Sequence, residues 1–119
     1  MSEQQELNRS VLEKLRNMGG DKFLGELINL FLEHAPKKLE EALASERSGD
    51  MEALERAVHS LKSSAGNLGA VAVQDLAGHI EQLASEKQAE SIPPLMRELE
   101  KKFARLPPWL EEIKRGASN

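Results

Sequence analysis

The residues best suited to chemistry lie in one short stretch around His59, which is followed by Lys62 and Ser63 three and four positions later. Apolar residues recur through this stretch at intervals of four and three positions, as on the inward face of an amphipathic helix: Leu54, Val58, Leu61, Ala65 and Leu68. At 100° per residue, His59 points roughly 140° away from that apolar stripe. The spacing therefore predicts an outward imidazole with a lysine and a small hydroxyl residue beside it.

This arrangement is suited to carrying a transferable group. An exposed imidazole that is largely neutral near pH 7 is a competent nucleophile. Lys62 supplies a mobile positive charge for an anionic group on the ring. Ser63 is small enough to let another molecule come close, and its hydroxyl can donate a hydrogen bond. Gly66, about two turns along on the same side, leaves further space.

The stretch from His59 to Ala70 resembles the signature of histidine-containing phosphotransfer (HPt) domains. In that signature an apolar residue follows the histidine at the second position, a lysine at the third, a small residue at the fourth and a glycine at the tenth. These positions are occupied here by Leu61, Lys62, Ser63 and Gly69. The fourth position is often glycine in the family, and serine is still small.

The resemblance covers most of residues 19–103 and is not confined to the histidine. The turn Ser48-Gly49-Asp50 looks like the family's entry to the histidine helix. Glu81, twenty-two residues after His59, stands where the family usually has Glu or Gln behind an apolar residue. Away from this resemblance, the ordinary interpretation of Glu81 is a solvated surface carboxylate, and the residues do not identify the group that binds the second ring nitrogen.

The resemblance implies a phosphorelay intermediate. His59 would accept a phosphoryl group from a phospho-aspartate of a receiver domain and pass it to another receiver aspartate, with the solvent-facing Nε2 as the attacking atom. Lys62 would stabilise the phosphoryl charge and Ser63 would give access. The chain would be a phosphocarrier without kinase activity of its own. It would bring no cofactor, since magnesium would lie in the acidic pocket of the receiver domain.

The composition favours an all-α fold. Of the 119 residues, 39% are hydrophobic and only 3% are aromatic, and leucine and alanine dominate the hydrophobic set. Leu, Ala, Glu, Lys and Arg favour helices, whereas β-branched residues are scarce. The length suffices for one domain with a buried core. We therefore expect a single helical domain over residues 1–119.

Several classes of protein are disfavoured. The chain has no cysteine, which excludes disulfides and thiolate metal sites and fits a reducing, cytoplasmic location. No stretch approaches the roughly 20 apolar residues needed to cross a bilayer, and the polar N-terminus does not read as a signal peptide. A net charge of −4 with mixed signs, and few aromatic residues, disfavour nucleic-acid binding.

Helix breakers divide the first half of the chain. A first helix is expected over residues 5–17, ended by Gly19-Gly20, after which Asp21 can cap the next helix. The second helix is expected over residues 22–47, kinked at Pro36, because its apolar phase is roughly kept across the proline.

The second half contains three further segments. Asp50 is the expected N-cap of the helix that carries His59. A fourth helix is expected over residues 71–87, and Pro93-Pro94 open a fifth that continues to residue 106. Pro107-Pro108 then halt or kink the chain ahead of a short apolar tail.

Four sizeable amphipathic helices with short connections predict an antiparallel four-helix bundle over residues 19–106. The additional N-terminal helix, residues 1–18, is expected to pack across one end, and residues 107–119 are expected to form a C-terminal tail. We expect a monomer.

The N-terminal helix also carries more apolar surface than its own packing requires: Val11, Leu12, Leu15 and Met18. We predict that Leu12, as the exposed member, borders His59 together with Leu15 and contacts a receiver domain. Gly66 and Glu81 complete the predicted docking surface. A small apolar patch rimmed by charge suits a transient partner.

Two other functions remain open on the residues alone. The i,i+4 pairs Glu55–His59 and Asp75–His79 could belong to a metal-binding bundle, although Glu55 and His59 face away from the predicted core and bundle metal sites lie inside it. A non-catalytic helical adaptor is the other alternative, and it would leave the pattern from His59 to Gly69 as coincidence.

Overall fold

The computed structural model describes residues 3–117, and every regular element in this range is helical. The elements in chain order are α1 (Glu3–Glu6), α2 (Arg9–Ser48), α3 (Met51–Asn67), α4 (Val71–Ser85), the 3₁₀ turn η1 (Ala89–Ser91), α5 (Ile92–Ala104) and α6 (Leu106–Ala117). The all-α class predicted from composition is confirmed.

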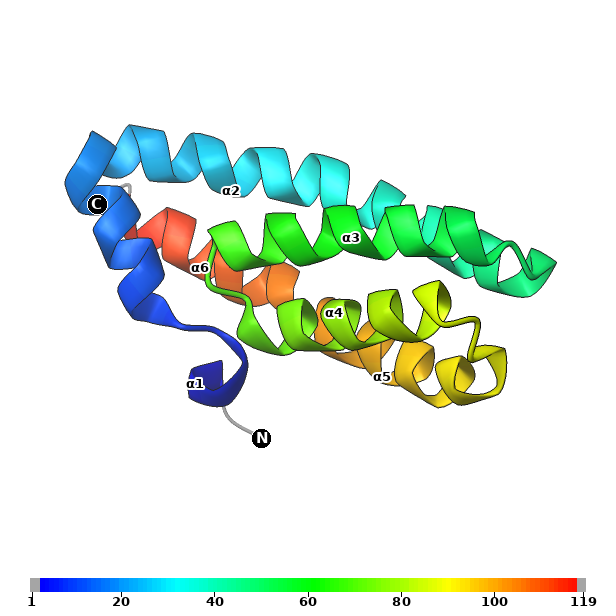
Figure 1. Cartoon of the computed structure of the whole chain (residues 1–119). Coiled ribbons are helices and arrows are strands. Elements are labelled where there is room, and N and C mark those ends of the chain that lie inside the picture. The colour runs from blue at the N-terminus through cyan, green and yellow to red at the C-terminus, as the bar shows by residue number, and fades with distance from the viewer. Residues whose placement is uncertain (1–2, 118–119) are drawn as a thin grey trace.

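The helices form an elongated antiparallel bundle of 46 × 25 × 20 Å (Figure 1). In Figure 1, α3 lies between α2 and α4, and it packs against both. Helix α5 packs on α4, while α6 packs on α2. The two C-terminal helices follow one another along the remaining side, so together they complete the four-helix arrangement.

The core is built from the apolar stripes of these helices. Four of its fully buried side chains come from three of them: Leu54 and Leu61 of α3, Ile80 of α4 and Leu99 of α5. Alanines fill much of the space between α3 and α4, where Ala65 and Ala77 are also fully buried. Close packing of small residues holds α3 at a fixed rotation, and this rotation decides which of its side chains face outward.

The connection between α2 and α3 fixes where α3 begins. Gly49 ends α2 with φ of 76°, in the left-handed region that glycine adopts without steric cost. Asp50 then accepts a hydrogen bond from the backbone N–H of Ala53 at 3.0 Å, which confirms it as the N-cap of α3.

The N-terminal part differs in detail from the helix expected over residues 5–17. Helix α1 stops at Glu6, and α2 begins at Arg9 behind the N-cap Asn8. The break has a tertiary cause, because Leu7 is buried and the N–H of Asn8 donates to the carbonyl of Gly69 at 2.7 Å. The chain end is thereby attached to the connection between α3 and α4.

The expected break at Gly19-Gly20 takes the form of a kink within α2. Gly20 has φ of 89° and ψ of 178°, which are not helical angles, and positive φ favours glycine. Figure 1 shows the dark-blue beginning of α2 crossing one end of the bundle before the lighter blue part runs along it. The expectation of an N-terminal helical segment across one end is thus confirmed.

Two proline-containing segments behave differently. One long helix with a kink at Pro36 was expected; α2 does continue through Pro36, but the residue with non-helical angles inside it is Gly20. Residues 107–119 were expected to be a tail, but α6 occupies this segment to Ala117, with Pro107 and Pro108 in its first turn, where a missing N–H is tolerated. Buried Leu110 and Ile113 attach α6 to the core.

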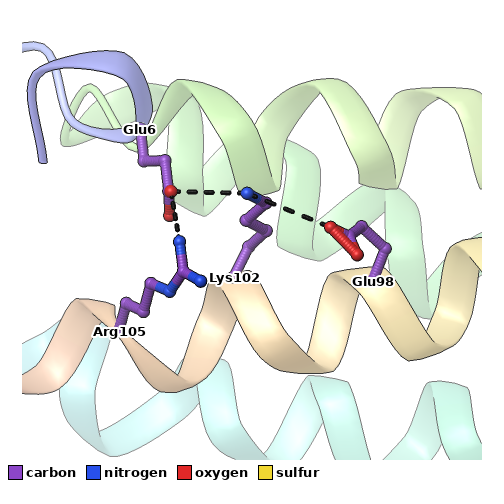
Figure 2. Close-up of polar contacts among 4 residues, drawn as sticks. All are labelled: Glu6, Glu98, Lys102 and Arg105. Carbon is purple, nitrogen blue, oxygen red and sulfur yellow. Dashed lines mark hydrogen bonds and ion pairs between the residues drawn. The ribbon is translucent and has the colours of Figure 1, made fainter. Parts of the chain in front are cut away.

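A buried ionic cluster anchors α1 to the C-terminal half (Figure 2). The Glu6 side chain is 2% exposed, and its Oε2 lies 3.3 Å from Lys102 Nζ and 2.5 Å from an Arg105 guanidinium nitrogen. Glu98 reaches Lys102 only at 3.9 Å. Buried charges of this kind require partners, so the cluster fixes the position of α1.

Candidate functional site

His59 lies in the middle of α3 and faces outward, as its place opposite the apolar stripe predicts. Its side chain is 58% exposed, whereas the neighbouring Val58 and Leu61 are fully buried. The imidazole lines a shallow surface depression of about 360 Å³ together with Glu55, Arg56, Ser60 and Glu81. The ring is therefore open to a second molecule.

Glu81 of α4 contacts both residues that the sequence singled out on α3. Its Oε2 lies 2.7 Å from Nδ1 of His59, and its Oε1 lies 2.7 Å from Nζ of Lys62. The Glu81 side chain is only 20% exposed, so the interpretation of it as a solvated surface carboxylate is wrong. The close packing of α3 on α4 brings it to the imidazole.

The carboxyl of Glu81 is held in its charged form. Burial alone would raise its pKa, but the hydrogen bonds from Lys62 and His59, together with their positive charges, hold the pKa below its usual range. Glu81 is therefore ionised near neutral pH and has no proton to donate.

The state of the imidazole follows from this contact. Because an ionised carboxylate only accepts hydrogen bonds, Nδ1 of His59 must carry the proton that it shares with Glu81. In the neutral ring the lone pair is then on Nε2. The arrangement thus combines a nucleophilic nitrogen, an exposed ring and an acceptor that stabilises positive charge on the ring.

The small residues near His59 have different environments. Ser63 is exposed on the same face of α3, one turn from His59. Gly66 lies against α4, where a Cβ atom would come within 2.7 Å of Nε2 of Gln74. Its missing side chain therefore serves the packing of α3 on α4. Gly69 has φ of 77°, and a Cβ there would lie 2.6 Å from the carbonyl oxygen of Asn8.

The prediction that Leu12 is an exposed docking residue is wrong. Leu12 is 2% exposed and belongs to the core, because the kink at Gly20 folds the beginning of α2 onto the bundle. Leu15 is half-buried and lines an apolar groove of about 390 Å³ between α2 and α3. The apolar periodicity of the segment did not reveal which side of it faces the bundle.

The exposed apolar side chains of this region are Met18 and Leu30 instead. Met18 is 76% exposed and Leu30 is 51% exposed, and Leu30 lines the same groove as Leu15. The α3 wall of this groove includes Ser64 and Asn67, one and two turns beyond His59 along the helix.

The alternative metal site receives no support from the contacts of His59. Its Nδ1 is bonded to Glu81 rather than paired with Glu55, and His79 is exposed on α4. Within the described residues, no group of three or more His, Asp or Glu side chains is placed to hold a metal ion. None of the helices between residues 3 and 117 has the length and apolar content that crossing a membrane requires.

Glu81 is the contact that the residue pattern left open. No rule of spacing within one helix connects positions twenty-two residues apart on two helices. The sequence signal for this contact was the family resemblance, in which Glu or Gln usually stands twenty-two residues after the histidine. In the structure, a carboxylate at this position lies opposite Nδ1 of His59.

Comparisons with known proteins bear on the family and the fold of the chain. A model of the Hpt domain family matches residues 26–114. The sensor protein TorS of Escherichia coli (strain K12) is 32% identical over 108 residues, which are 91% of this chain but 11% of TorS. The chain thus spans a small part of the length of that curated relative.

Two solved structures share the fold. Histidine-containing phosphotransfer protein B (HptB) of Pseudomonas aeruginosa PAO1 superposes with a TM-score of 0.87 at 24% identity, over 92% of this chain and 95% of that one. The HPT domain of a sensor hybrid histidine kinase from Shewanella gives a TM-score of 0.80 at 18% identity, over 95% of this chain and 97% of that one.

Proposed function

The chain belongs to the Hpt domain family, the phosphotransfer domains of phosphorelays, and we propose that His59 is the residue that accepts and returns the phosphoryl group. The observation that carries this proposal is the hydrogen bond between Nδ1 of His59 and Glu81, which leaves the lone pair of Nε2 on an exposed ring. The phosphoryl donor and acceptor are aspartates of receiver domains, and the chain has no kinase activity of its own.

The transfer step is an in-line displacement at phosphorus. The Nε2 lone pair forms the N–P bond as the bond from phosphorus to the receiver aspartate's oxygen breaks, and the electron pair of that bond stays on the aspartate. The proton on Nδ1 remains in place, so the ring becomes a positively charged imidazolium. Glu81, 2.7 Å away, stabilises this charge, and the reverse step returns the ring to its neutral form.

Lys62 and Ser63 have distinct roles in this proposal. Lys62 stabilises the charge on the phosphoryl oxygens, and its flexible side chain can leave Glu81 to reach them. Ser63 is exposed one turn from His59, where a larger side chain would keep a receiver domain away. Magnesium belongs to the receiver's acidic pocket in this scheme, and no residue of this chain holds it.

A receiver domain docks on the face of α2 and α3 next to His59. The apolar groove lined by Leu15 and Leu30 provides the contact area, and Met18, which is exposed on the same helix α2, adds to it in this scheme. An apolar patch of this size, bordered by polar residues, suits a partner that must bind and leave within each transfer. The chain acts in this scheme as a monomer in the cytoplasm.

The test is the transfer of a phosphoryl group from a phosphorylated receiver domain to the chain. A receiver domain loaded by a small phosphodonor is incubated with the chain, and acid-labile phosphate is located by mass spectrometry. We expect phosphate on His59 of the parent chain and none on His59→Gln, whose exposed side chain leaves the fold intact. The reverse transfer, from the phosphorylated chain to an unphosphorylated receiver, tests the direction.

His79→Gln is the matched control, since His79 is an exposed histidine of α4 outside the depression around His59. This variant should accept phosphate at the rate of the parent chain. Acid-labile phosphate on His59→Gln would show that another residue is the acceptor.

A further inference from the structure

The positive charge of Lys62 beside His59 is already paired before a phosphoryl group arrives. Lys62 is paired with Glu81 at 2.7 Å, and Glu55 brings a second carboxylate to the same depression. A phosphoryl group adds about two negative charges on its oxygens, whereas the imidazolium ring adds one positive charge. The phosphorylated site therefore carries excess negative charge, and a second cation beside Lys62 would reduce it.

Arg56 is placed to supply it. Arg56 precedes His59 by three residues, just as Lys62 follows it by three, so the two cations flank the imidazole about one helical turn away on opposite sides. The arginine lines the depression that contains His59 and Glu81, and its side chain is exposed. A long, exposed guanidinium side chain on the rim of this depression is free to turn toward a group bound to the ring.

Arg56 is also uncommitted in the resting protein. Among the residues whose side chains the structure describes, none forms an ion pair or a hydrogen bond with its guanidinium group. Lys62, in contrast, must give up its contact with Glu81 before it can turn fully to a phosphate. A guanidinium group also matches two phosphate oxygens at once, which an ammonium group does not.

We propose that Arg56 binds the phosphoryl oxygens during transfer and in phosphorylated His59, as a second cation beside Lys62. The proposal rests on His59 being the phosphoryl acceptor. Arg56 gives up no proton: the N–P bond forms and the bond from phosphorus to the donor's leaving group breaks, while Arg56 contributes charge and hydrogen bonds only.

The decisive experiment loads His59 without a protein partner. Phosphoramidate, a small donor of phosphoryl groups to histidine, is incubated with the parent chain, Arg56→Ala and Arg56→Lys, and phosphate on His59 is followed by mass spectrometry. We expect Arg56→Ala to be loaded about three- to tenfold more slowly, since an exposed charge contact contributes on the order of 1 kcal/mol. Arg56→Lys should recover part of the loss. Transfer from a charged receiver should fall by a similar factor.

Arg97→Ala is the control, because Arg97 is an exposed arginine of α5 that has no ion-pair partner among the described residues. It should behave as the parent chain. If Arg56→Ala is loaded by phosphoramidate at the parent rate, the proposal is overturned, and a loss seen only with the receiver would make Arg56 a docking residue. A third outcome is that receiver domains never phosphorylate His59, although loading by phosphoramidate still depends on Arg56. This would support the contact of Arg56 with the phosphoryl oxygens and contradict the phosphorelay function.

Discussion

At the scale of single residues, the site depends on Glu81 contacting His59 and Lys62 at the same time. The carboxylate accepts the Nδ1 proton through one oxygen and pairs with the lysine through the other. The first contact orients the ring and selects its tautomer, and the second keeps Lys62 close to the ring in the resting state. Substitutions of Glu81 can separate these two effects.

Glu81→Gln should slow phosphoryl transfer less than Glu81→Ala. The glutamine carbonyl still accepts a hydrogen bond from Nδ1, so the tautomer is kept, but the negative charge opposite the imidazolium is lost. We expect a loss of a few-fold for Glu81→Gln and of about ten- to a hundredfold for Glu81→Ala, measured as the rate of phosphate gain on His59. Equal rates for both variants would mean that Glu81 does not select the ring tautomer.

The stability contributed by Glu81 should depend on pH in a defined direction. Because the pKa of Glu81 is lower in the folded chain, its ion pair stabilises the fold above the ordinary glutamate pKa of about 4.3, and this stabilisation is lost as the pH falls through the folded value. A His59→Gln background removes the imidazole and leaves the pair between Glu81 and Lys62. There, Glu81→Gln should lower the free energy of unfolding by about 0.5–1 kcal/mol at pH 7, since Lys62 is partly exposed.

Urea unfolding at several pH values checks this. We compare the free energy of unfolding of His59→Gln with that of the double variant His59→Gln with Glu81→Gln. The difference between them should shrink below about pH 4 and vanish when Glu81 is protonated. A difference that grows on acidification would contradict the lowered pKa. Lys62→Met in the same background should remove the pH dependence, because it removes the partner that holds the charge.

At this scale the sequence identified His59, the proposed phosphoryl acceptor, but not the contact that Glu81 makes with it. The outward position of His59 followed from its angle to the apolar stripe, and the fold confirms it. The bond to Glu81 depends on the rotation of α4 against α3, which side-chain packing determines and periodicity within one helix does not. Arg56 was overlooked because a lone exposed arginine carries no signal until its neighbours in space are known.

At the scale of elements, the groove between α2 and α3 is the proposed contact area for a receiver domain that reaches His59. Leu30 projects from α2 into this groove and is 51% exposed, although its neighbour Phe31 is buried in the core. Leu30 therefore offers apolar surface at the groove that we propose as the contact area for a receiver domain.

Leu30→Asp should weaken receiver binding about tenfold or more with little change in the free energy of unfolding. The aspartate places a charge in an apolar contact, whereas the exposed half of the leucine contributes little to the core. Titration calorimetry with a receiver domain measures the first effect and urea unfolding the second. Leu30→Met keeps the apolar surface and should bind as the parent chain does. Unchanged affinity of Leu30→Asp would move the docking face elsewhere.

The boundaries of the elements could be predicted where local chemistry decides them. Asp50 caps α3 through a side-chain bond to a residue three positions on, a purely local event. The end of α1 is different, because Asn8 donates to Gly69, a residue 61 positions away in the chain. The burial of Leu12 is also a tertiary effect, because the kink at Gly20 folds the beginning of α2 onto the bundle, whereas Met18 of the same segment stays exposed.

At the scale of the whole molecule, α1 is connected to the end of α5 through charges. Glu6 of α1 is buried against Lys102 of α5, ninety-six positions later, and against Arg105. The cluster thus attaches α1 to the C-terminal end of α5 (Figure 2). Removing one member of a buried pair leaves the other charge uncompensated, which is more costly than losing the pair as a unit.

Glu6→Ala should therefore lower the free energy of unfolding by about 2–3 kcal/mol, because Lys102 then remains buried without its carboxylate. Glu98→Ala is the matched control: Glu98 is half-exposed and 3.9 Å from the same lysine, so its loss should cost about 0.5 kcal/mol or less. The double variant Glu6→Leu with Lys102→Leu should recover much of the stability, since it removes both buried charges together. Urea unfolding of the four chains measures these differences. If Glu6→Ala costs no more than Glu98→Ala, Lys102 can reach water when its partner is lost, and the attachment of α1 depends on Leu7 rather than on the ion pair.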